Sequence, residues 1–129
     1  MTLCDIVIPV YNQPDLTRAC VESVFRTTRI PARLIIVDNA SDPATKSVIS
    51  TFASNQHITV DVITNETNLG FSKAVNQGLR KGGSPFSLVL NNDTIFTDDC
   101  LKIMIDVARG VSDIGIVNPE SNTFGVRPG

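Results

Sequence analysis

The chain has 129 residues, of which 42% are hydrophobic and 19% charged, and its formal net charge is -2. These values fit one soluble globular domain, and they exclude the basic field that attracts nucleic acid or an anionic membrane. We expect neither a leader sequence nor a transmembrane segment. The three cysteines lack close partners in sequence, so we expect reduced thiols and a cytoplasmic protein, either free or peripheral to the inner face of a membrane in a longer parent protein.

Short β-rich runs alternate with amphipathic helical runs along the chain. We expect strands at Asp5–Val10, Arg33–Asp38, Thr59–Thr64, Phe86–Leu90 and Ile114–Val117. We expect helices at Pro14–Thr27, Pro43–Ala53, Phe71–Lys81 and Asp98–Arg109. This alternation indicates right-handed βαβ units and predicts an α/β fold, a three-layer α/β/α sandwich with a mostly parallel sheet. No repeat or internal boundary divides residues 1–129, which we interpret as a single domain.

Helix ends are marked by residues that suit them. Prolines stand in the first turn of two helices, where the missing N–H is harmless, and Gly82 follows the third helix. Ala74 and Gly78, one turn apart, are expected to let the third helix pack closely on a neighbour. We expect N-caps from Asn12 or Gln13, from Ser41 or Asp42, and from Thr97.

The apolar run Phe86–Leu90 ends abruptly in Asn91, Asn92 and Asp93. Such a run fits a buried sheet only if its polar end projects from the sheet edge. We therefore expect these three residues at the carboxyl end of a parallel strand, where open α/β sheets bind ligands. Their oxygens suit a hard cation such as Mg²⁺ or Mn²⁺. A plain strand-end turn is the alternative, because Asn and Asp favour turns.

Four segments, in this order, resemble the family 2 glycosyltransferases, which transfer a sugar from a nucleotide diphosphate to an acceptor. The segments are Ile6–Asn12, Ile35–Asp42, Asn68–Gly78 and Leu88–Thr94. The last two are similar to the patterns of the rhamnosyltransferase-like branch. Another nucleotide-binding class, the nucleotidyltransferases, usually has a glycine-rich basic loop after the first strand. The corresponding segment here, residues 11–15, has no glycine.

The resemblance implies the amino-terminal half of the glycosyltransferase A-type fold. It implies an inverting transfer in which a base deprotonates the acceptor hydroxyl. We find no catalytic residue in this chain and expect the base, and the contacts to a saccharide or lipid-linked acceptor, in a second half. Residues 1–129 are therefore interpreted as a truncated donor-binding part for a UDP- or dTDP-sugar, inactive alone. A non-catalytic nucleotide-binding or interaction module is the alternative, and the short chain and Asn91 favour it slightly.

The resemblance also assigns the metal site and the contacts with phosphate. It places the family's metal-binding DXD motif on Asn91 and Asp93, with Asn92 as a substrate contact, and the metal would be Mn²⁺ or Mg²⁺. Asn91 stands where the first aspartate is usual, which leaves Asp93 as the one charged ligand. The turn and helix start at Asn68, Gly70 and Lys73 would bind the diphosphate or ribose, because N–H groups at a helix start favour anions. For Lys73, a solvated surface role is the alternative.

For the nucleotide base, the resemblance implies a pocket along Pro9, Val10 and Tyr11. Asp38, at the end of the second strand, would accept a hydrogen bond from a base N–H. The alternatives are a semi-buried surface aromatic for Tyr11 and a helix-capping turn for Asp38. Two other groups are rejected as sites: the pair Asp98 and Asp99 fits a helix start, and the single histidine, His57, lies in a polar run.

Overall fold

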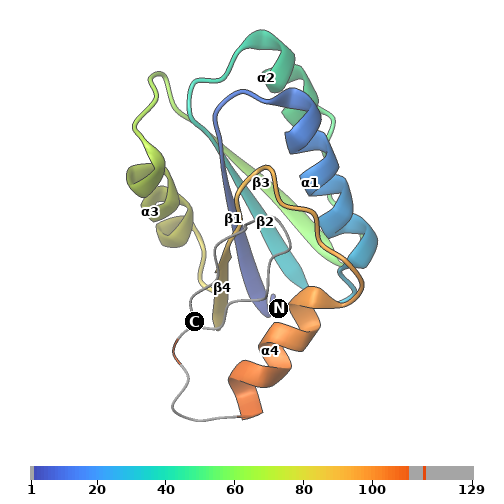
Figure 1. Ribbon diagram of the computed structural model, residues 1–129. Helices are drawn as coiled ribbons and strands as arrows, with labels where there is room; N and C mark the ends of the chain where they lie inside the picture. The colour runs from blue at the N-terminus through green and yellow to red at the C-terminus, as the bar shows by residue number, and fades with distance from the viewer. Residues whose placement is uncertain (1, 111–114, 116–129) are drawn as a thin grey trace, which may run out of the picture.

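The computed structural model describes residues 2–110 and 115, and within them four strands alternate with four helices (Figure 1). The elements are β1 (Cys4–Val10), α1 (Pro14–Thr27), β2 (Ala32–Asp38), α2 (Pro43–Ser50), β3 (Ile58–Thr64), α3 (Phe71–Lys81), β4 (Phe86–Val89) and α4 (Cys100–Gly110). The predicted alternation is thus confirmed over this range. The predicted strand Ile114–Val117 lies outside the described residues, apart from Gly115.

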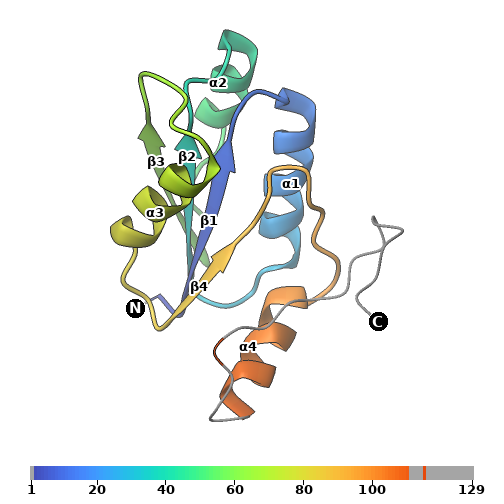
Figure 2. The same ribbon diagram turned by 60° about the vertical axis from the view of Figure 1, so that its left-hand side comes forward.

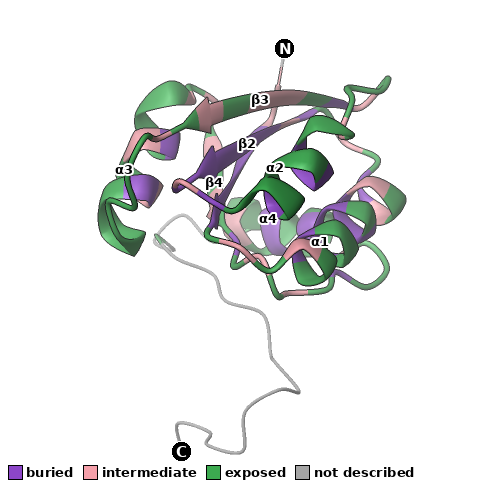
Figure 3. Ribbon diagram, turned by 90° about the horizontal axis from the view of Figure 1, so that it is seen from above, coloured by how far each residue is buried: buried purple, intermediate pink, exposed green. Residues whose placement is uncertain are grey.

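The four strands form one parallel sheet in the order β3-β2-β1-β4. Helices α1, α2 and α4 cover one face and α3 covers the other (Figures 2 and 3). On β1, Ile6 and Ile8 belong to the core beneath α1, whereas Val7 belongs to the smaller core beneath Ala74 of α3. Since both faces are covered, the central strands are continuous apolar runs. The predicted three-layer sandwich is confirmed.

Glycine lets α3 lie close to the sheet, as the spacing of Ala74 and Gly78 predicts. Both residues are buried, and a Cβ added at Gly78 would collide with Cγ1 of Val7 in β1. The helix ends where expected, with the N–H of Gly82 donating to the carbonyl of Gly78. The close approach fixes α3, and with it the preceding turn, against the middle of the sheet.

The expected cap positions are confirmed at two helices, only one of which has a side-chain cap bond, and the expected cap is wrong at the third. The side chain of Asp42 accepts a hydrogen bond from the Thr45 N–H and caps α2. Gln13 is the N-cap of α1, but its side chain makes no cap bond and its φ is 66°. Thr97 does not cap α4. Asp98 has a φ of 46°, outside the helical region, so the helix begins only at Cys100.

Two further elements, α2 and β4, end earlier than expected. Helix α2 ends at Ser50 instead of Ala53, because the hydroxyl and the N–H of Thr51 both donate to the carbonyl of Val48 and tighten the last turn. Strand β4 ends at Val89, one residue early. Within residues 2–110 and 115, no helix combines the length and the apolar character needed to cross a membrane.

Candidate functional site

The carboxyl ends of β1, β2 and β4 meet the start of α3 at a cavity of about 230 Å³. Its lining residues are Pro9, Val10, Tyr11, Asn39, Phe71, Asn91, Asn92 and Asp93. Six of these come from the two sequence segments predicted to hold the base and the metal. The parallel sheet brings those segments, some eighty residues apart in sequence, to one place.

Tyr11 projects from the point where β1 ends. The ladder between β1 and β2 runs to the pair Val10 and Asp38, and then Asn12 and Gln13 turn the chain with φ values of 58° and 66°. This turn leaves 52% of Tyr11 exposed at the cavity. The side-chain oxygen of Asn12 accepts a hydrogen bond from the N–H of Asp42 at 2.8 Å. This bond holds the turn after β1 against the turn after β2.

Asp38 is buried and already bonded, and it does not line the cavity. Its Oδ1 accepts the Ser41 N–H at 3.0 Å, and its Oδ2 lies 2.8 Å from Nζ of Lys46. Burial acts to raise the pKa of Asp38, but the bonds from Lys46 and Ser41 outweigh it and the pKa is lowered. The carboxylate is therefore ionised near neutral pH. Asp42, not Asp38, caps the following helix.

Asn39 and Phe71 line the cavity but were not predicted from the sequence. Asn39 follows Asp38 directly and is only 4% exposed, whereas Phe71 follows Gly70 and is 56% exposed. Both lie inside segments that carry the family resemblance. The signal that could have found Asn39 is its place beyond the last paired residue of β2, where the chain leaves the sheet.

The turn before α3 and the first turn of the helix hold three predicted residues that do not line the cavity. The side chain of Asn68 accepts the Gly70 N–H at 2.9 Å, and Gly70 adopts a φ of 87°. The Gly70 carbonyl accepts the Ala74 N–H and opens the helix. Lys73 is exposed on the first turn of α3. The roles predicted for these residues stay predictions.

The segment after β4 is held against α1 by its amides. Nδ2 of Asn92 donates to Oγ1 of Thr17 at 3.0 Å and to the carbonyl of Asn12 at 3.4 Å. Asn91 and Asp93, on either side, are exposed. Asn92 therefore orients its neighbours, with its side-chain N–H groups committed to the protein.

The buried thiol beneath this segment is chemically inert. Burial raises the pKa of Cys20 to about 12, and the nearby charge of Asp93 acts in the same direction, so Cys20 stays a neutral thiol. Cys4 is also buried and Cys100 half-buried, and all three cysteines are free, as predicted. None of them supports nucleophilic catalysis.

The donor atoms at the cavity suit a hard cation but supply little charge. In the described part of the chain, no three His, Cys, Asp or Glu side chains cluster as a metal centre. Asp93 gives one carboxylate, and Asn91 adds an amide oxygen. Magnesium-type sites often combine one or two carboxylates with phosphate oxygens of the substrate, and these residues fit such a shared site.

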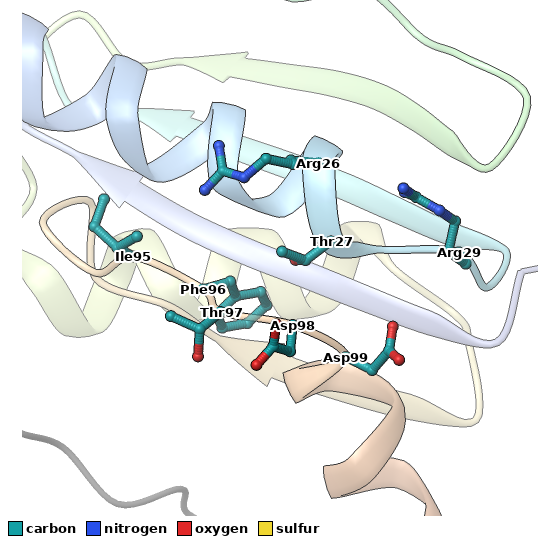
Figure 4. A pocket seen from close by; sticks show the side chains of 8 residues that line it. All are labelled: Arg26, Thr27, Arg29, Ile95, Phe96, Thr97, Asp98 and Asp99. Atoms are coloured by element: carbon teal, nitrogen blue, oxygen red, sulfur yellow. The ribbon is translucent and has the colours of Figure 1, made fainter.

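A larger cavity, of about 520 Å³, lies away from this edge of the sheet. Figure 4 shows Arg26 and Thr27 at the end of α1 on one side, with the segment that leads into α4 on the other. Asp98 and Asp99 line this second cavity, apart from Asp93. Volume alone does not make it the functional site, because it is remote from the strand ends where this fold binds ligands.

The sequence profile of glycosyl transferase family 2 matches residues 5–122. The chain belongs to this family. A PGL/p-HBAD biosynthesis glycosyltransferase of Mycobacterium tuberculosis is 28% identical over 120 residues, which cover 93% of this chain and 44% of that protein. Like the other curated relatives it matches, that enzyme is much longer than the chain. The rhamnosyltransferase-like branch is not singled out by these matches.

Solved structures show the same fold. Staphylococcus aureus TarS 1-349 in complex with UDP-GlcNAc superposes with a TM-score of 0.75 at 17% identity, over 91% of this chain and 37% of that TarS 1-349 chain. The mannosyltransferase PcManGT from Pyrobaculum calidifontis, in complex with GDP-Man and Mn²⁺, gives a TM-score of 0.68 at 17% identity, over 74% of this chain and 29% of that one. The glycosyltransferase A-type fold is thus confirmed.

Proposed function

We propose that this chain binds the donor, a UDP- or dTDP-sugar, for an inverting glycosyltransferase. The observation that carries the proposal is the cavity at the strand ends, which joins two exposed aromatic rings, Tyr11 and Phe71, to the carboxylate of Asp93. Flat aromatic faces suit a nucleotide base, since stacking on a side chain is worth about 1–3 kcal/mol per base. Membership of the family and the nucleotide sugars bound to TarS and PcManGT support this ligand class.

The diphosphate would lie near Asp93 and bring its own cation. The chain is slightly acidic, so two phosphates would not be held by the protein's net charge. Asp93 and Asn91 would hold Mn²⁺ or Mg²⁺ together with phosphate oxygens. Bound there, the cation would offset the charge of the leaving diphosphate. The complex of PcManGT with GDP-Man and Mn²⁺ supports this metal for the fold.

The preference for a pyrimidine rests on Asp38, as predicted from the sequence. Ser41 and Lys46 each occupy one of its oxygens, but a carboxylate has about four acceptor positions. Asp38 could therefore accept a base N–H only through the remaining positions. Asn39, the next residue along the chain, lines the cavity, whereas Asp38 does not.

Transfer itself would need groups supplied by a longer parent protein. Asp98 and Asp99 line the other cavity, and Asp106 lies on α4 paired with Lys102 at 2.7 Å. These carboxylates are not placed to deprotonate an acceptor at the donor cavity. We infer that the base and the acceptor pocket lie in the portion of the relatives that this chain does not match, and that the parent acts in the cytoplasm on a saccharide or lipid-linked acceptor.

The competing function is a non-catalytic nucleotide-binding module. One observation favours it: Asn91 supplies an uncharged oxygen where the family usually has an aspartate. A single carboxylate would hold a cation weakly in the absence of phosphate. The two functions share the donor site, so activity of a longer protein carrying both halves separates them.

The intrinsic fluorescence of Tyr11 tests the donor site without a label, because the chain contains one tyrosine and no tryptophan. We expect UDP with Mn²⁺ to quench this emission saturably and ADP to bind more weakly, with absorption by the nucleotide corrected against free tyrosine. Phe71→Ala should weaken UDP binding about 5- to 150-fold, the factor that corresponds to the stacking energy given above. Ile103→Ala, which also removes an exposed apolar side chain, is the control. Equal affinity for ADP, or an unchanged Phe71→Ala variant, would refute the assignment.

A further inference from the structure

A buried residue, Asn39, joins the two sides of the donor cavity through its side chain and its backbone N–H. Oδ1 of Asn39 accepts the N–H of Leu69 at 3.0 Å, and its Nδ2 donates to the carbonyl of Gly70 at 3.1 Å. The backbone N–H of Asn39 donates to the carbonyl of Val10 at 2.8 Å. One residue thus bonds both the segment before Tyr11 and the segment before Phe71.

Two more amides hold Asn39 in place. Nδ2 of Asn65 donates to Oδ1 of Asn39 at 3.0 Å. Asn65 and Gln77 exchange two hydrogen bonds, each of 2.8 Å, through their side chains. The backbone N–H of Asn65 also donates to the carbonyl of Asp38 at 2.9 Å. The amide network of Asn39, Asn65 and Gln77 therefore links the ends of β2 and β3 to the middle of α3.

The aromatic walls depend on such a network because their own side chains are poorly packed. Tyr11 is 52% and Phe71 is 56% exposed. The turn of residues 66–70 that precedes Phe71 is exposed throughout, and its Gly70 has a φ of 87°. The two bonds from Asn39 tie this turn to the sheet at Leu69 and Gly70. The position of Phe71 thus follows from the backbone, which the network holds.

We propose that the amide network positions Phe71 opposite Tyr11 and so sets the gap that receives the nucleotide base. This inference rests on the proposed function, and it assigns positioning roles to Asn65 and Gln77, which do not line the cavity. Gln77 acts through Asn65, and Asn65 acts through Asn39. Preformed walls favour binding because the ligand does not have to order the turn.

Gln77→Leu tests the proposal, because it removes both bonds to Asn65 while keeping a side chain of similar size. Asn39→Ala is less suitable, since it leaves several groups unpaired and endangers folding. We expect the dissociation constant of UDP with Mn²⁺, measured by Tyr11 fluorescence and by calorimetry, to rise about 2- to 30-fold, the range for residues that act at a distance. Circular dichroism identifies a temperature at which every variant is folded, and binding is measured at that temperature.

Asn55→Ala is the matched control. The side-chain oxygen of Asn55 accepts two hydrogen bonds, from the N–H groups of His57 and Ile58 at 2.8 and 2.7 Å, at the opposite end of the sheet. Asn55→Ala should lower the melting temperature and leave UDP affinity unchanged. A purely structural role for Gln77 would give that same pattern and would refute the proposal, as would equal weakening by both variants. If the unmodified chain does not bind UDP, the proposed function itself fails.

Discussion

Breaking the ion pair between Lys46 and Asp38, beside the candidate site, should destabilise the protein in a pH-dependent way. Lys46→Met leaves the side chain of Asp38, which is 3% exposed, without its cation at 2.8 Å. Removing one partner of a fully buried pair costs about 3–5 kcal/mol, whereas an exposed pair contributes about 0.2–1 kcal/mol. Lys46 is 44% exposed, so solvent screens part of the interaction and we expect a loss of about 1–3 kcal/mol. For a domain of this size that loss lowers the melting temperature by about 4–12 °C.

The sign of the pH dependence follows from the lowered pKa of Asp38. The stability that a depressed carboxyl pKa contributes is present above the unfolded pKa of about 3.9, and it is lost as the pH falls through the folded value. The difference between the wild type and Lys46→Met should thus be largest near neutral pH and shrink below about pH 4.

Thermal and urea unfolding between pH 3 and pH 7 measures the difference. Lys102→Met is the matched control, because Lys102 and Asp106 form a pair of nearly the same length, 2.7 Å, on the exposed face of α4. Its loss should be hardly measurable. A Lys46→Met penalty no larger than that of the control, or one that does not change with pH, would refute the reasoning.

Three further predictions concern the helix packing, the metal and turnover. Gly78→Ala should destabilise by about 0.5–2 kcal/mol, because the collision with buried Val7 outweighs the gain in helix propensity; equal unfolding of Gly83→Ala, whose added Cβ meets nothing within 4 Å, would contradict this. Asp93→Ala should abolish most of the Mn²⁺-dependent UDP binding seen by calorimetry while Asp99→Ala keeps it, and the reverse order would show that the site is misplaced. The purified chain should transfer no measurable sugar from a radiolabelled donor, and saturable transfer to a defined acceptor would overturn the expectation that the base lies elsewhere.

The order of strands and helices could be predicted from the sequence because buried parallel strands and their cover helices have clear periods. The ends were less predictable. The residues around Asp98 do not indicate that it adopts a positive φ, or that α4 begins only at Cys100. Gln13 occupies the N-cap position of α1, but its side chain makes no cap bond. The turn is held instead by the bond between the Asn12 side chain and the N–H of Asp42, in the turn after β2. The turn before α1 thus depends on a contact between segments thirty residues apart in sequence.

The candidate site was predictable where its residues end a strand and less so where they join loops. Tyr11 and Asp93 lie at the cavity because parallel strands place their carboxyl ends together. Asn39 was not predicted because an uncharged amide after a strand is equally typical of a plain turn. The structure shows Asp38 bonded to Ser41 and Lys46, and it shows Asn39 at the cavity. Which amides pair with one another cannot be read from a sequence that contains many of them.

Donor binding and sugar transfer place different demands on a protein, and the proposed function assigns only donor binding to this chain. Binding a nucleotide diphosphate needs a stacking surface and a cation ligand, and in the proposed function Tyr11, Phe71 and Asp93, which line one cavity at the edge of the sheet, would provide them. Transfer needs in addition a base within hydrogen-bond reach of the acceptor hydroxyl, a contribution of about 10²–10⁴-fold in rate. It also needs the acceptor held in line with the donor, which contributes still more. If this chain meets only the demands of binding, it will hold a donor without consuming it, and the binding step can then be measured at equilibrium.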